Sequence, residues 1–271
     1  FSEVQLFSFS RNRNPLLVVL TVVLQSSERS CKLPLNEQEL SMKKERPATT
    51  PSCAACALPT FDRACVSEEG RPSKGCPTFS RKKVLSDSNR EYETPDVLEF
   101  ARQASIQEAA CYANRHERPY VMQPTKTRIV EICEFAERMG YKRLGLAFCL
   151  GLAKEAAVVE EILKTKGFEV ISVLCKAGRT PKESLGLKEE HKIYQGKPES
   201  MCNPIYQARL LNHEKTEFNI LLGLCVGHDS LFFKFAKAPT TVLAVKDRVT
   251  GHNPLAAIYL SETYYRRLKT P

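Results

Sequence analysis

Apolar and polar positions alternate in blocks along the second half of the chain. The short apolar runs fit buried strands, and stretches with helical spacing separate them. The strands are expected at 143–149, 168–175, 218–225 and 241–246, and the helices at 94–114, 127–139, 153–166, 205–213 and 231–237. Strands that alternate with helices through short connections are typical of βαβ units. The pattern therefore predicts an α/β fold, with a three-layer, Rossmann-like parallel sheet and helices on both faces. The polar stretch 176–201 breaks the alternation, which indicates a lid or binding loop.

Composition divides the chain into three parts. Residues 1–41 combine two arginines with an apolar run, as in a signal peptide, but no small-residue cleavage site follows. We therefore expect a disordered leader or upstream sequence, with Met42 as the natural start. Residues 42–90 are rich in Pro, Ser and charge and too poor in large apolar side chains for a core, which predicts a cysteine-rich metal-binding segment. Residues 91–271 form the α/β domain.

The overall charge and cysteine content narrow the functional classes. The formal net charge is +9, but basic and acidic residues are interspersed and no nucleic-acid-binding motif accompanies them, so nucleic acid is an unlikely partner. No apolar run is long enough to span a bilayer. Eleven cysteines in an α/β chain of 271 residues favour metal or thiol chemistry over a disulfide framework. A metal ion is thus the expected partner, and a small-molecule or redox partner is left open.

Four cysteines gather in the polar segment before the α/β domain. They are Cys53, Cys56, Cys65 and Cys76, the first two as Cys-x-x-Cys and the last followed by Pro77. Four soft ligands on one zinc ion or iron–sulfur cluster could stabilise a segment that apolar burial cannot. The spacing matches no standard ferredoxin pattern. The alternative is a flexible tail with incidental or redox-paired thiols.

A second set of cysteines falls at the ends of predicted strands. Cys149, Cys175 and Cys225 end three strands, while Cys202 and His252 each precede an Asn-Pro helix start. The carboxyl ends of parallel strands share one sheet edge, and helix N-termini there lower thiol pKa values. We expect a second metal site, with Cys149, Cys175 and Cys202 as ligands, or a set of reactive thiolates. The nearby bases or ligands are His228, Asp229, Asp247 and His252. Alternatively, each buried cysteine acts only as a small hydrophobe.

The stretch Gly223-Leu224-Cys225-Val226-Gly227 supports a rival hypothesis. It has the spacing of a nucleophile elbow, with cysteine in the serine position. Cys225 as nucleophile, His252 as base and Asp247 as its orienting acid would make a cysteine-dependent hydrolase or transferase. This hypothesis leaves the other cysteines unexplained.

Long motifs in the α/β domain resemble a prokaryotic family of uncharacterised metal-binding proteins, a domain of unknown function with an amino-terminal cysteine cluster. The motifs include Gly145 to Leu152, Ser172 to Lys176, Cys202-Asn203-Pro204, Phe218 to Phe232, and Ala238 to Pro254. The resemblance covers roughly residues 53–260 and implies metal binding and an intracellular, cytoplasmic location, but it supplies no reaction. A non-catalytic metal sensor or carrier therefore stands beside the enzymatic hypotheses.

Overall fold

The computed structural model describes residues 49–271, so the leader expected at 1–41 lies outside the described residues. The chain divides into two compact units between Arg81 and Lys82. In the first unit, the described elements are short: η2 (Cys53–Ala55), η3 (Thr60–Asp62) and α2 (Pro77–Ser80). None of these elements buries a residue, in keeping with a segment that apolar packing does not stabilise.

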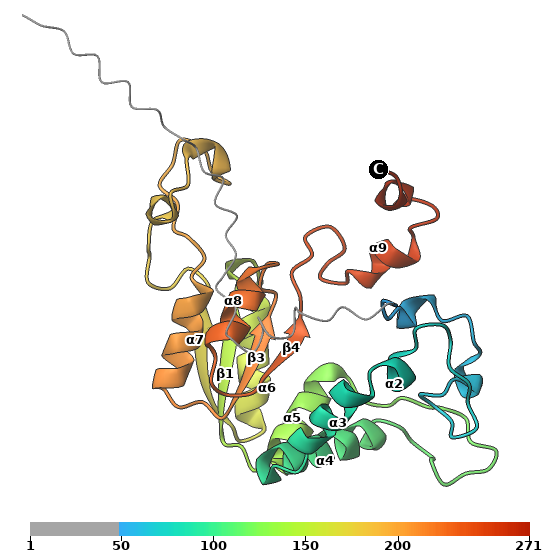
Figure 1. Cartoon of the computed structure of the whole chain (residues 1–271). Helices are drawn as coiled ribbons and strands as arrows, with labels where there is room; N and C mark the ends of the chain where they lie inside the picture. The colour runs from blue at the N-terminus through green and yellow to red at the C-terminus, as the bar shows by residue number, and fades with distance from the viewer. Residues whose placement is uncertain (1–48) are drawn as a thin grey trace, which may run out of the picture. The chain divides into compact units, whose positions relative to one another are not determined.

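The second unit is built on a four-stranded parallel sheet, which confirms the α/β prediction (Figure 1). The strands are β1 (Arg143–Phe148), β2 (Glu169–Leu174), β3 (Phe218–Leu222) and β4 (Thr240–Ala244), in the order β2-β1-β3-β4. The helices are α3 (Lys82–Glu91), α4 (Pro95–Ala110), α5 (Arg128–Arg138), α6 (Ala153–Thr165), α7 (Pro204–His213), α8 (His228–Phe235) and α9 (Leu255–Tyr259). Shorter turns are η4 (Leu150–Leu152), η5 (Lys182–Leu185), η6 (Glu189–His191) and η7 (Arg266–Lys269).

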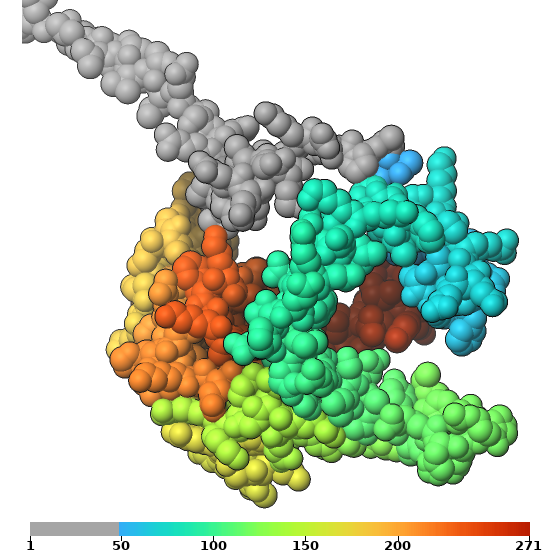
Figure 2. Space-filling model, turned by 60° about the horizontal axis from the view of Figure 1, so that its bottom comes forward, coloured from blue at the N-terminus to red at the C-terminus, as the bar shows by residue number. Residues whose placement is uncertain are grey.

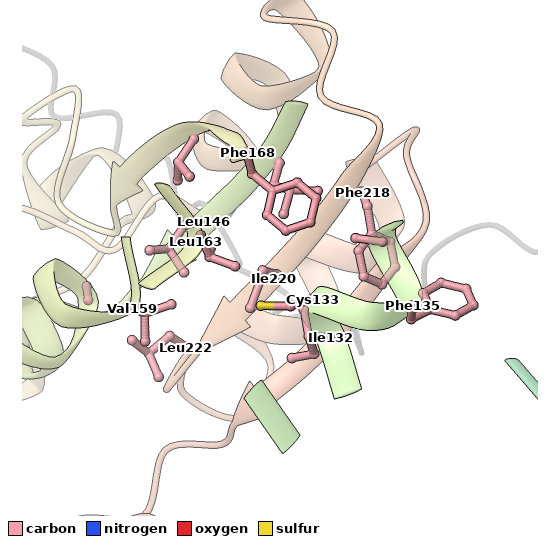
Figure 3. Packing of buried hydrophobic residues seen from close by; sticks show 14 of the residues in the cluster. Ile132, Cys133, Phe135, Leu146, Val159, Leu163, Phe168, Phe218, Ile220 and Leu222 are labelled. Carbon is pink, nitrogen blue, oxygen red and sulfur yellow. The ribbon is translucent and has the colours of Figure 1, made fainter. Parts of the chain in front are cut away.

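Both faces of the sheet carry apolar side chains packed against helices. Leu144 and Leu146 of β1 join one core cluster with residues of α5 and α6, part of which Figure 3 shows. Ala147, which points to the opposite face, joins a second cluster with residues of α7 and α8. Every residue of β3 is buried. A strand that is covered on both faces has a continuous apolar sequence. The sequence pattern could therefore locate the strands of this sheet.

The strand order places a topological switch point between β1 and β3. From β1 the chain passes through α6 to β2 on one side, and it later returns to β3 on the other side of β1. In open α/β sheets, ligands bind outside the carboxyl ends of the strands at such a point. The loops after β1 and β3 therefore lie where chemistry is expected.

The long polar stretch 176–201 is organised around one carboxylate. Glu199 is 9% exposed, and it accepts hydrogen bonds from the backbone amides of Ile193 (2.9 Å) and Tyr194 (3.4 Å). Its carboxylate also pairs with Lys182 at 2.8 Å and with Lys176 at 3.7 Å. These contacts give the loop an internal polar core in place of an apolar one.

The sequence pattern did not identify α3 as a helix, and the structure shows why. All of its residues lie at the surface or partly so, and Val84 and Leu85 are exposed; Figure 2 shows this segment in teal. The structure assigns α3 to the second unit, whereas the sequence placed these residues in the cysteine-rich segment. Among the described helices, none is both long and apolar enough to cross a membrane.

Candidate thiol and metal sites

Cys149 and Cys175 are neighbours at the carboxyl edge of the sheet. Phe148 pairs with Leu174 in the last register position of β1 and β2, so the two cysteines follow at equivalent places. The Cys175 amide donates to the Phe148 carbonyl at 2.9 Å. Both thiols are buried, with exposed fractions of 8% for Cys149 and 3% for Cys175. The structure thus brings together two of the cysteines that the sequence assigned to one edge.

Cys202 and His228 extend this pair into a chain of four side chains. The amide of Asn203 donates to the Cys175 carbonyl at 2.8 Å, which holds Cys202 beside Cys175. Interaction with Cys175 is the leading cause of the pKa shifts of Cys149 and Cys202, and interaction with Cys202 is the leading cause of the pKa shift of His228, in keeping with four neighbouring side chains. We call Cys149, Cys175, Cys202 and His228 the thiol chain.

Contacts within the thiol chain separate the proton affinities of its members. Hydrogen bonding with Cys175 lowers the pKa of Cys149, and the same contact, with that of His228, lowers the pKa of Cys202. Hydrogen bonding with both neighbours, together with burial, raises the pKa of Cys175. The contact with Cys202 raises the pKa of His228. Of the three thiols, Cys175 therefore holds its proton most tightly.

Two lysines supply further positive charge, and sequence reasoning missed both. Lys246 lowers the pKa of Cys149, and its ammonium lies so close to Gly151 that a β-carbon there would stand 2.8 Å from Nζ. Lys176 lowers the pKa of Cys202. Lys176 directly follows a strand-end cysteine and Lys246 ends the strand expected at 241–246, so the reasoning that grouped the cysteines could have included them.

Gln207 of α7 fixes the strand ends that carry the thiols. Its Nε2 donates to the carbonyl of Val173 at 2.8 Å, two residues before Cys175, and to that of Phe148 at 3.2 Å, one residue before Cys149. The side chain is fully buried, and its Oε1 has no hydrogen-bond partner. A single glutamine in a predicted helix gives no sequence signal for this role.

Cys225 lies apart from the thiol chain. Its sulfur accepts a hydrogen bond from Nη2 of Arg248 at 3.1 Å. Gly223 and Gly227 adopt left-handed backbone conformations, with φ of 68° and 82°, whereas Cys225 does not. The nucleophile of an elbow sits at the strained residue of the turn. The turn around Cys225 therefore has the glycines of the motif without the strained nucleophile.

Asp247 and His252 shape the loop that follows β4. Oδ1 of Asp247 accepts hydrogen bonds from the amides of Val249 (2.9 Å) and Thr250 (3.0 Å), and the bond from Thr250 is the main cause of its lowered pKa. Nδ1 of His252 accepts from the Asp247 amide at 3.1 Å. In a catalytic triad, this nitrogen instead donates to the carboxylate. Asp229 similarly accepts from the amide of its neighbour Ser230. These contacts give no support to the hydrolase hypothesis.

In the first unit, all four predicted cysteines, Cys53, Cys56, Cys65 and Cys76, line one cavity of about 40 Å³. A turn closed by the Cys56 amide on the Cys53 carbonyl, at 3.1 Å, brings the first two together. Arg63 supports this turn, because its guanidinium donates to the carbonyls of Leu58 (2.8 Å) and Cys56 (3.3 Å).

The donor set at this cavity suits a soft metal, since four thiolates are the ligands of structural zinc and of iron–sulfur clusters. Within residues 49–271, no group of three or more His, Cys, Asp or Glu side chains is already arranged to hold a metal ion. Metal binding at the cavity therefore requires its four thiols to close on the ion, as in sites where binding and folding are coupled.

Comparison with known proteins identifies the family. The model of a family described as protein of unknown function, DUF1847, matches residues 76–243. The chain belongs to this family. It is also 43% identical over 188 residues to the uncharacterized protein MJ0455 of Methanocaldococcus jannaschii, a match that covers 69% of this chain and 89% of that protein. The family match spans the whole thiol chain and, of the four cysteines at the cavity, only Cys76.

Two solved structures also show partial similarity. The crystal structure of Dph2 from Pyrococcus horikoshii matches 54% of this chain with 20% identity and a TM-score of 0.29. The structure of the same protein with a 4Fe-4S cluster matches 53% with 19% identity and a TM-score of 0.28. This chain covers 34% of either structure, and at such TM-scores neither bears on its function.

Proposed function

We propose that this DUF1847 protein is a metal-binding thiol protein with two centres, one in each unit. The first holds zinc or an iron–sulfur cluster on Cys53, Cys56, Cys65 and Cys76. The second, the thiol chain, is a redox-thiol site. A cytoplasmic location belongs to the proposal, because the ten cysteines that the structure describes are all unpaired thiols, as reducing compartments keep them.

The observation that carries the first centre is that the four cysteines share one cavity. They are spread over 24 residues, from 53 to 76, in a unit whose described helical turns bury no residue. A bound metal would supply the cross-links that such a unit lacks, and would stabilise it in place of an apolar core.

The second centre differs because its thiols are neighbours along the backbone of adjacent segments. Cys175 lies beside both Cys149 and Cys202, so the three residues form a chain rather than the wall of a cavity. Neighbouring thiols of unequal proton affinity are suited to thiol–disulfide chemistry. The site lies at the carboxyl edge of the sheet, and the two core clusters support the three-layer, Rossmann-like arrangement predicted around it.

Metal analysis of the full chain, purified without oxygen, tests the proposal. We expect zinc, or iron with acid-labile sulfide and a visible absorption band, and we expect the C53S/C56S variant to lose it. The C149S/C202S variant is the matched control, since it removes two thiols from the other centre and should keep the metal. Metal-free wild-type protein, or equal metal loss in both variants, would contradict the assignment of the metal to the amino-terminal cavity.

A further inference from the structure

Exposure differs sharply along the thiol chain. Cys175 and Cys149 are buried, at 3% and 8%, whereas Cys202 is partly exposed. His228, at the first position of α8, is also partly exposed and contacts Cys202. The order from solvent inward is thus the partly exposed Cys202 with His228 beside it, then the buried Cys175, then the buried Cys149.

The backbone holds both neighbouring pairs at distances that suit a disulfide. Cys149 and Cys175 follow paired residues of adjacent parallel strands, which lie about 4.8 Å apart. Asn203 is bonded through its amide to the carbonyl of Cys175, so the backbone of Cys202 passes directly beside that residue. Disulfides need a Cα separation of about 4.4–6.8 Å, which adjacent backbone segments provide.

We propose that the thiol chain carries out thiol–disulfide exchange with small disulfide substrates, with Cys202 as the attacking thiol and Cys175 as the resolving thiol. This inference rests on the redox-thiol role proposed for the second centre. It specifies the substrate class, the order of attack and the partner of each sulfur.

The exchange proceeds in two balanced steps. In the first, the Cys202 thiolate attacks one sulfur of a disulfide RSSR and forms a mixed disulfide, while the S–S bond of RSSR breaks. The departing RS⁻ takes a proton from His228 and leaves as RSH. In the second, the Cys175 sulfur attacks the Cys202 sulfur of the mixed disulfide and passes its proton to the Cys149 thiolate. The second RS⁻ leaves, and a Cys175–Cys202 disulfide remains. Two electrons pass from the protein to the substrate.

Cys225 supplies an internal control. It is partly exposed at the same end of the sheet and lies beside a cation, Arg248, but its sulfur contacts no member of the thiol chain. If exposure and positive charge alone determined reaction with disulfides, Cys225 would react as Cys202 does. The proposal requires Cys202 to differ, because only Cys202 has a resolving thiol beside it.

The test is to incubate the reduced full chain with glutathione disulfide, quench with acid, alkylate, and map the products by mass spectrometry. Wild-type protein should contain a Cys175–Cys202 disulfide, with no glutathione left on either residue. C175S should retain glutathione on Cys202. C202S should slow the attachment of glutathione within the thiol chain by about tenfold or more, because Cys149 and Cys175 are buried. C225A should behave as wild type.

Reaction that stops at mixed disulfides in wild-type protein, or a C175S variant that behaves as wild type, would overturn the proposal. Unreactive wild-type Cys202 would overturn it as well. The metal content of the same samples is read separately, and C53S/C56S should still form the Cys175–Cys202 disulfide. Failure of exchange and failure of the amino-terminal metal site are therefore distinguishable.

Discussion

A β-carbon on Gly145 would stand 2.2 Å from Oδ1 of Asn219, the residue it pairs with across β1 and β3. Asn219 is fully buried in the middle of the sheet. Its Oδ1 accepts from the hydroxyl of Thr216 at 2.8 Å, and its Nδ2 donates to that of Thr240 at 3.4 Å. Because Gly145 has no side chain, there is room for the buried side-chain amide of Asn219. This amide links β3 to the loop before it and to the start of β4.

Gly145→Ala should therefore destabilise the fold. The new methyl group displaces Asn219 or Leu211, and overpacking of this kind costs about 1–3 kcal/mol. Denaturant unfolding monitored by circular dichroism measures the loss. Gly151→Ala is the matched control, since its β-carbon would meet only the flexible end of Lys246. Equal losses in the two variants would show that the Asn219 contact is not what makes Gly145 necessary.

Gln207→Met should destabilise the strand ends that carry the thiols. The substitution keeps the volume but removes both donors, leaving the carbonyls of Phe148 and Val173 short of a partner, at a cost of about 1–3 kcal/mol. Denaturant unfolding gives the change in free energy. Gln103→Met, on partly exposed α4, should change stability by less than about 0.5 kcal/mol. A neutral result at 207 would mean that the two carbonyls find other donors.

Glu199 should make stability depend on pH in the acid range. The ion pair with Lys182 is the main cause that lowers its pKa to about 2. Because the folded pKa lies below the unfolded one, the stabilisation is fully present above the ordinary pKa of a glutamate, near 4.5, and is lost as the pH falls toward about 2.

Thermal unfolding of wild type and Glu199→Gln across this range measures the effect. The difference in stability between wild type and Glu199→Gln should shrink steadily as the pH falls from about 4.5 to 2. The exposed Glu190, changed to Gln, is the control and should give a small difference at every pH. A difference in stability between wild type and Glu199→Gln that stays constant with pH would contradict the assigned ion pair.

Arg63→Met should weaken metal retention at the amino-terminal cavity without removing a ligand. Arg63 holds the carbonyls of Cys56 and Leu58, and the loss of such supporting contacts typically lowers metal affinity about 10–100-fold. Competition with a chelator measures the change. Arg71→Met is the control, because the Arg71 side chain is 72% exposed and its ion pair with Asp62 is long, at 3.9 Å. Identical retention in both variants would argue against a supporting role for Arg63.

The sequence located the thiol edge but not all of its members. Cys149 and Cys175 follow strands in register, so the carboxyl-end rule was enough to place them together. Cys225 was grouped with them, yet β3 ends at Leu222 and Gly223 turns the chain toward β4, where the Lys246 amide binds the Leu224 carbonyl. Cys225 therefore meets Arg248 instead of another thiol.

What the sequence determined by itself was the alternation of strands and helices, and with it the parallel sheet and the edge where its cysteines end. Those features follow from local periodicity and from which residues can be buried on both faces of a strand. Only the tertiary structure decided that Cys175 lies between Cys149 and Cys202, that Lys246 reaches across Gly151, and that Gln207 holds two strand ends. Such contacts join residues far apart in the chain, and they depend on turn geometry and side-chain direction, which periodicity does not encode.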